Sequence, residues 1–88
     1  MNITLSFIAC IIEPGVIIGK GNDAINVTYK TTGPSMCSNL CAALEKCEAW
    51  TMRIDGNYCW LKSDSDNSRK TKKEGWVTGT KACGKNAG

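Results

Sequence analysis

Six cysteines in a chain of 88 residues restrict the possible folds more than any other feature of this sequence. They are Cys10, Cys37, Cys41, Cys47, Cys59 and Cys83. A domain of this length buries only about 60–65% of the surface that its unfolded chain exposes, so its core is marginal without cross-links. An even number of cysteines at this density predicts three disulfides and an oxidising, extracellular compartment. Spacing alone leaves fifteen pairings open.

Zinc binding is the alternative role for these cysteines. Structural zinc sites join a close pair of cysteines to a second close pair or to histidines. This chain has no histidine, and no two of its cysteines are separated by only two residues. We therefore expect no metal and no cofactor. The lack of histidine also removes the usual general base near neutral pH, and the cysteines are committed to disulfides, so we expect no enzymatic activity.

The periodicity of the apolar residues predicts a small α+β domain with one helix packed across an antiparallel sheet. Residues 35–46 have helical spacing and begin just after Pro34, a residue favoured at a helix start. Strands are expected at residues 2–9, 16–18, 24–30, 49–53, 58–62 and 76–82. Turns are expected at residues 19–23 and 55–57, and the polar segment 63–74 favours a long loop.

The N-terminal apolar run, residues 3–12, resembles the core of a signal peptide in composition only. No Lys or Arg precedes it and no good cleavage signal follows it, and it is too short to span a bilayer. We therefore expect an N-terminal strand or arm over residues 1–9, one domain over residues 10–83 and a tail over residues 84–88. No other segment predicts a membrane span.

Several spaced motifs follow one another in the second half of the chain. A helix that carries Cys37 and Cys41 is followed by CEAWT at 47–51, CWLKS at 59–63 and TGTKAC at 78–83. In this order they resemble the PAN/apple superfamily over residues 10–83. Thr78 stands where that family commonly has Ser, and the strand before Cys10 is not required by the module.

The resemblance implies a nested set of disulfides and a type of function. The implied pairs are Cys10 with Cys83, Cys37 with Cys59 and Cys41 with Cys47. PAN/apple domains are known for binding carbohydrate or protein in extracellular settings, so the resemblance implies a non-catalytic binding or assembly module.

Three tryptophans stand out in so short a chain. Trp50 is expected to pack in the core against the helix. Trp60 follows Cys59, so if Cys59 faces the helix, Trp60 lies on the opposite face of the sheet. An exposed indole there suits sugar stacking or a protein contact, whereas a covering strand would make it a core residue. Both interpretations are open, and the same holds for Trp76.

The net charge of +3 is mildly basic, and no dense basic stripe interleaved with aromatic residues predicts nucleic-acid binding. Clustered basic residues can bind sulfated or acidic glycans. The cluster here consists of Lys62, Arg69, Lys70, Lys72 and Lys73. Neighbouring acidic residues dilute its field, which favours a solvated loop without ligand. The segment 64–68 lacks the later Gly and Glu of a calcium loop, so we expect no calcium there.

Self-assembly is the first function that the sequence favours. The apolar side chains Ile3, Leu5 and Phe7 would let the arm add to the sheet edge of a second copy. Head-to-tail repetition of this contact would build a filament. Sequons at Asn2 and Asn26 predict N-glycans on its outside.

The alternative function is a monomeric adhesion module. Such a module would bind an extracellular protein or glycan through Trp60, Trp76 or the basic residues of segment 62–73. An expected partner is therefore either a second copy of this chain or an extracellular protein or glycan.

Overall fold

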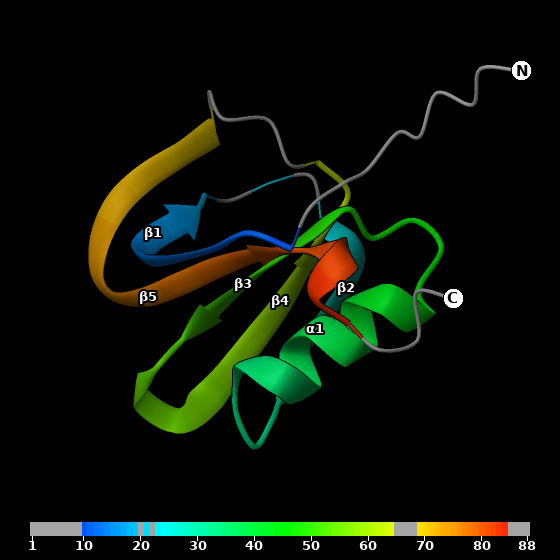
Figure 1. Cartoon of the computed structure of the whole chain (residues 1–88), viewed down its shortest axis with the longest axis horizontal. Helices are drawn as coiled ribbons and strands as arrows, with labels where there is room; N and C mark the ends of the chain where they lie inside the picture. The colour runs from blue at the N-terminus through cyan, green and yellow to red at the C-terminus, as the bar shows by residue number, and fades with distance from the viewer. Residues whose placement is uncertain (1–9, 20, 22, 65–68, 85–88) are drawn as a thin grey trace, which may run out of the picture.

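A computed structural model describes residues 10–19, 21, 23–64 and 69–84. One helix packs on one face of a five-stranded antiparallel sheet, so the expected α+β class is confirmed (Figure 1). The elements are β1 (Ile12–Ile18), β2 (Asp23–Lys30), α1 (Pro34–Ala43), β3 (Ala49–Arg53), β4 (Tyr58–Lys62) and β5 (Lys70–Thr80), with short 3-10 helices at Asp55–Asn57 and Lys81–Cys83. The strand order is β1-β5-β3-β4-β2.

The central hairpin of β3 and β4 lies at the positions expected from sequence. Trp50 pairs with Leu61, and Met52 pairs with Cys59. The connecting turn requires positive φ at Gly56, which has a φ of 85°. Glycine adopts this conformation without the steric cost that a side chain would bring.

Alternation along the central strands gives the sheet one apolar face, which α1 covers. The buried core contains Trp50, Met52, Leu61 and Val77 together with four of the cysteines. Trp50 is fully buried, as expected, and its Nε1 donates a hydrogen bond of 3.2 Å to the carbonyl oxygen of Thr80. Its one polar atom is thereby satisfied, which allows so large a side chain to be buried without cost from an unpaired donor.

All six cysteines are paired. Cys10 is joined to Cys83, Cys37 to Cys59 and Cys41 to Cys47, which are the pairs that the family resemblance implies. The second and third disulfides lie in the core between α1 and the sheet, where their sulfurs contribute to the packing. The first connects the start of β1 to the residues just after β5.

The helix is shorter than the sequence predicts, because it ends at Ala43 rather than at Lys46. In a continuous helix the Cα atoms of Cys41 and Cys47 would lie about 10 Å apart, beyond the reach of a disulfide. The chain instead leaves the helix at Leu44, which has extended geometry, and the two Cα atoms are 5.3 Å apart. The disulfide therefore requires the helix to end before Cys47.

The predicted loop at 63–74 is wrong in its second half, since β5 already begins at Lys70. This part of β5 carries exposed Thr and Lys side chains, so it shows no apolar alternation. It is held by pairing with β1, in which Val16 lies opposite Lys72 and Ile18 lies opposite Lys70. β1 is correspondingly longer than the expected strand at residues 16–18.

The β1–β5 pair bends strongly, which gives the molecule a second layer (Figure 1). Its register shifts between Pro14 and Val16, and both Gly15 and Gly75 have positive φ. Beyond this shift the two strands lie over the sheet face opposite α1, and Ile18 is buried there. We call the part of β1 and β5 beyond the shift, residues 16–18 and 70–73, the curled ribbon.

Several expectations lie outside the described residues. These are the strand at residues 2–9 with Ile3, Leu5 and Phe7, the sequon at Asn2, and most of the tail at 84–88. Within the part of the chain that the structure describes, no helix has the length and apolar character needed to cross a bilayer.

Candidate functional site

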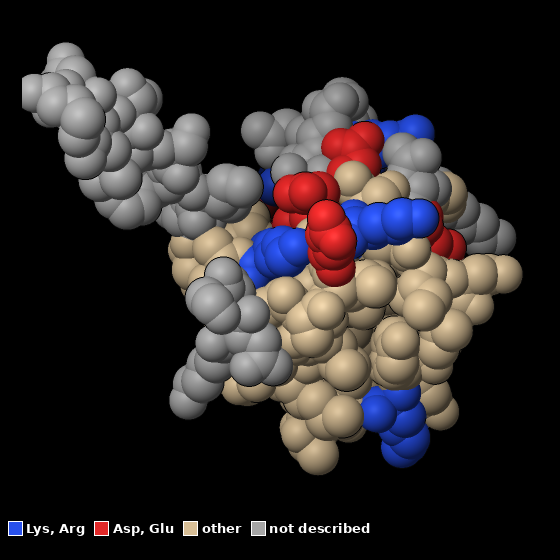
Figure 2. Space-filling view, turned by 90° about the vertical axis from the view of Figure 1, so that its right-hand side faces the viewer, with Lys and Arg blue, Asp and Glu red and all other residues tan. Residues whose placement is uncertain are grey.

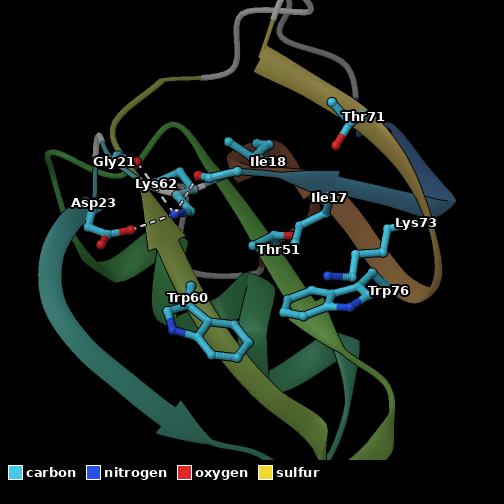
Figure 3. Close-up of a pocket in the computed structure, with 11 residues that line it drawn as sticks. Ile17, Ile18, Gly21, Asp23, Thr51, Trp60, Lys62, Thr71, Lys73 and Trp76 are labelled. Atoms are coloured by element: carbon cyan, nitrogen blue, oxygen red, sulfur yellow. Dashed lines mark hydrogen bonds and ion pairs between the residues drawn. The ribbon is translucent and has the colours of Figure 1, made fainter.

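A groove of about 620 Å³ opens on the sheet face opposite α1 (Figure 3). Its floor consists of Trp60 from β4 and Trp76 from β5, with Thr51 of β3 between these strands. The curled ribbon contributes Ile17 and Lys73 to its wall, and the turn between β1 and β2 closes one end. The groove is therefore made where the second layer meets the sheet.

The position of each tryptophan follows from strand alternation. Cys59 is buried toward α1 by its disulfide to Cys37, so the next residue, Trp60, faces the groove. Val77 packs in the core, so Trp76 before it also faces the groove. This confirms the expectation that Trp60 lies on the face opposite the helix.

The two indole rings contact each other across β3. Their centroids are 5.1 Å apart and their planes are tilted by 31°, within the range of favourable aromatic pairs. Both side chains are half-buried. The curled ribbon shields the pair in part, so Trp60 is neither a core residue nor a fully exposed one. The pair presents a concave apolar floor to solvent.

Lys62 lines the groove but is not a free surface cation. Its side chain is only 5% exposed, and its Nζ lies 2.6 Å from Oδ1 of Asp23. The same ammonium also donates hydrogen bonds to the carbonyl oxygens of Gly19, at 3.1 Å, and Gly21, at 3.5 Å. Lys62 therefore fixes the turn between β1 and β2 at the end of the groove.

The remaining basic residues expected to form a cluster are separated by the fold. Arg69 pairs with Asp64, and Lys70 Nζ lies 2.6 Å from Oε1 of Glu13. Lys72 is exposed on β5. Lys73 alone of this set joins the tryptophans, with its Nζ 5.5 Å from the ring centroid of Trp76.

Charges of both signs also mix elsewhere on the surface. On the side shown in Figure 2, Lys or Arg and Asp or Glu side chains lie together in one band, and most of the remaining described surface is uncharged. The helix contributes to this neutral character, because Pro34–Ala43 contains no charged residue. That side therefore has no extended field of a single sign.

Three further residues of this face, Lys30, Arg53 and Tyr58, were not predicted from the sequence. They form one cross-strand row with Trp76, because Lys30 is opposite Tyr58, Tyr58 is opposite Arg53, and Arg53 is opposite Trp76. Lys30 Nζ and Arg53 Cζ each lie 5.1 Å from the Tyr58 ring centroid. We call these four residues the cation–aromatic row. Strand alternation places them on the groove face, but only the strand order brings them together.

Two threonine hydroxyls connect the groove floor to the curled ribbon. Thr78 Oγ1 donates a hydrogen bond of 2.8 Å to the carbonyl oxygen of Val16. It lies 2.9 Å from Thr51 Oγ1, and because its single hydrogen is used, Thr51 is the donor in that contact. These hydrogen bonds connect the ribbon to the floor of the groove.

Asn26, the described sequon residue, lies on the edge strand β2. Its side chain and that of Thr28 are exposed. The β2–β4 register shifts between Asp23 and Thr28, so this stretch departs from regular pairing. The sequon is accessible on the surface, and its glycosylation stays a prediction.

Comparisons with protein-family models, with curated proteins and with solved structures find no match for this chain. The PAN/apple resemblance therefore stays a prediction that is carried by the motifs and their order. Among the described lining residues the one carboxylate is that of Asp23, and it is bonded to Lys62.

Proposed function

We propose that this chain is a non-catalytic extracellular recognition module that binds a saccharide in the groove over Trp60 and Trp76. The observation that carries the proposal is the pair of half-buried indole rings, 5.1 Å apart on the floor of an open groove. Indole rings offer a large apolar face with little loss of conformational entropy on binding, which suits the C–H face of a sugar ring.

The size and surroundings of the groove agree with this proposal. A volume of about 620 Å³ falls in the range of small-ligand sites, which combine apolar walls with a few polar groups. Here Ile17 supplies an apolar wall, and Lys73 and Thr71 supply polar groups at the ribbon. Three disulfides are typical of an extracellular protein, and the PAN/apple resemblance implies carbohydrate or protein as the ligand.

The sheet edges favour recognition over assembly by strand addition. The edge strand β1 contains Pro14, which lacks a backbone donor, and its register shifts directly after that residue. The other edge strand, β2, is irregular between Asp23 and Thr28. Proline and bulges are features that discourage pairing with another chain. Assembly through Ile3, Leu5 and Phe7 stays a prediction, because these residues lie outside the described part of the chain.

A glycan array probed with the oxidised chain tests the proposal, followed by calorimetric titration of the best oligosaccharide. We expect Trp60→Ala and Trp76→Ala each to weaken binding by roughly tenfold or more, as for loss of a central aromatic contact. Met36→Ala is the control, since Met36 is exposed on α1, across the sheet from the groove. Thermal unfolding of each variant shows that it is folded.

Two results would contradict the proposal. One is an array on which no saccharide is bound by the folded chain. The other is an affinity that both tryptophan substitutions leave unchanged, because the ligand would then bind elsewhere on the surface.

A further inference from the structure

We infer that the saccharide recognised at this site is a polyanion, a chain bearing sulfate or carboxylate groups that extends from the groove along the cation–aromatic row. This inference rests on the proposed function and specifies its ligand. The row crosses β2, β4, β3 and β5, which are neighbours in the sheet. Three inter-strand spacings give it a length of about 14 Å, enough for an extended ligand rather than a single small anion.

The cations of this surface lie against aromatic rings instead of against carboxylates. Lys30 and Arg53 approach Tyr58, and Lys73 approaches Trp76. Within the part of the chain that the structure describes, none of these three cations forms an ion pair.

Three of the four other cations of the basic segment behave differently. Lys62, Arg69 and Lys70 each pair with a carboxylate, whereas Lys72 is exposed on β5 and forms no ion pair with a described residue. The fold thus leaves positive charge unneutralised where the aromatic rings are, and neutralises most of the charge of the basic segment beside them.

The acidic residues next to the row do not cancel its charge. Asp55 accepts a hydrogen bond of 3.0 Å from Arg53 Nε, but through its backbone carbonyl oxygen rather than through its carboxylate. Glu74 is exposed next to Lys73, and no ion pair joins them. Lys30 and Arg53 on either side of one ring repel each other, so an anion placed between them gains from both charges.

The order of side chains along the row matches the chemistry of an acidic polysaccharide. The row alternates cation, ring, cation, ring, in the sequence Lys30, Tyr58, Arg53, Trp76. An acidic polysaccharide alternates anionic groups with the apolar faces of its sugar rings. Each cation can therefore meet an anionic group while each neighbouring ring stacks on a sugar.

The test compares three probes by calorimetry: a heparin-derived oligosaccharide, the same oligosaccharide after complete desulfation and acetylation of the freed amines, and a neutral gluco-oligosaccharide of equal length. The desulfated probe retains its carboxylates, so it separates the two kinds of anionic group. We expect the sulfated probe or both anionic probes to bind at least tenfold more tightly than the neutral one. If three charges are neutralised, affinity for the anionic probe falls roughly 20- to 40-fold between 50 mM and 200 mM salt.

Charge-removing variants locate the contact. We expect Lys30→Gln, Arg53→Gln and Lys73→Gln each to weaken binding of the anionic probe by roughly three- to tenfold. Lys46→Gln removes the same charge from an exposed position just after α1 and is expected to change the affinity by less than twofold. All four side chains are exposed, so thermal unfolding of the variants should match that of the parent chain.

The outcomes separate this inference from the proposed function. Equal, salt-insensitive binding of neutral and sulfated probes, lost in Trp60→Ala, would overturn the polyanion and leave saccharide recognition standing. Absence of binding to all three probes would overturn the polyanion inference. It would also overturn the proposed function if the array shows no saccharide ligand. A single-stranded oligonucleotide is titrated separately. If it binds more tightly than the sulfated probe, the row recognises a polyanion other than a saccharide and the inference is overturned.

Discussion

The indole ring of Trp50 lies directly against the backbone of Gly79, its register partner on β5. A Cβ atom on residue 79 would overlap the ring, since a real Cβ never approaches other atoms so closely. Trp50 cannot move aside easily, because it is fully buried and its Nε1 is bonded to the Thr80 carbonyl oxygen. The absence of a side chain at Gly79 is therefore what allows the largest core residue to fit.

Gly79→Ala should consequently destabilise the domain. We expect the free energy of unfolding to fall by about 2–3 kcal/mol, the cost of overpacking a close-packed core. Urea unfolding followed by fluorescence measures this change. Gly19→Ala is the matched control, since Gly19 has no described atom within 4 Å of the added methyl group and no positive φ. Equal stability of the two variants would refute the close contact.

Removing the disulfide between Cys37 and Cys59 should lower the free energy of unfolding more than a substitution on the surface does. Cys37→Ala combined with Cys59→Ala opens a loop of 22 residues, for which chain entropy predicts a loss of about 3 kcal/mol. Both sulfurs are fully buried, so lost packing adds to this cost. Chemical unfolding of the double variant measures the loss. A variant as stable as the parent would show that the helix is held by packing alone.

The side chains of Lys62 and Asp23 should contribute to stability as an interacting pair, because Lys62 is nearly completely buried. Lys62→Met leaves the Asp23 carboxylate and two backbone carbonyls without their donor, and we expect a loss of about 2 kcal/mol in the free energy of unfolding.

A double-mutant cycle with Asp23→Asn separates the pair from its surroundings. The double variant should be less destabilised than the sum of the two single variants. Strict additivity would mean that the two side chains do not interact in solution. Lys46→Met, at an exposed position, controls for loss of a lysine charge.

The contact between Trp60 and Trp76 should be visible by spectroscopy without any ligand. Two indoles at a centroid distance of 5.1 Å couple their electronic transitions, so we expect an exciton couplet in the circular dichroism spectrum. Trp60→Phe and Trp76→Phe should each remove it completely, because either change eliminates the pair. A couplet that persists in both variants would contradict this arrangement of the rings.

Much of the fold followed from sequence periodicity, but only where side chains face a core. The hairpin β3–β4 was predicted at its observed positions because Trp50, Met52, Cys59 and Leu61 alternate with groove-facing residues. The first half of β5 was missed because it is stabilised by backbone pairing with β1 rather than by burial of its own side chains. The helix end was missed because the Cys41–Cys47 disulfide is incompatible with a helix that continues to Cys47, although the apolar periodicity gives no sign of an earlier end.

The groove was harder to foresee than the sheet. Alternation with Cys59 predicted the face on which Trp60 lies, but its contact with Trp76 depends on the order of the strands. The burial of Lys62 depends on backbone carbonyl oxygens of a turn about forty residues earlier in the sequence. Backbone acceptors are present at every residue, so the sequence does not show which of them will bind Lys62. Local sequence patterns do not specify the order of the strands, so the contacts that depend on this order could not be predicted.

The disulfide between Cys10 and Cys83 has a mechanical consequence. It joins the two points where the described domain meets the rest of the chain, with their Cα atoms 4.6 Å apart and a sequence separation of 73. Tension applied through the flanking segments would pass along this covalent link and bypass the sheet. The chain between the two cysteines would measure about 250 Å if fully stretched, but the disulfide prevents this extension. A pulling force on the two ends would therefore not unfold the domain.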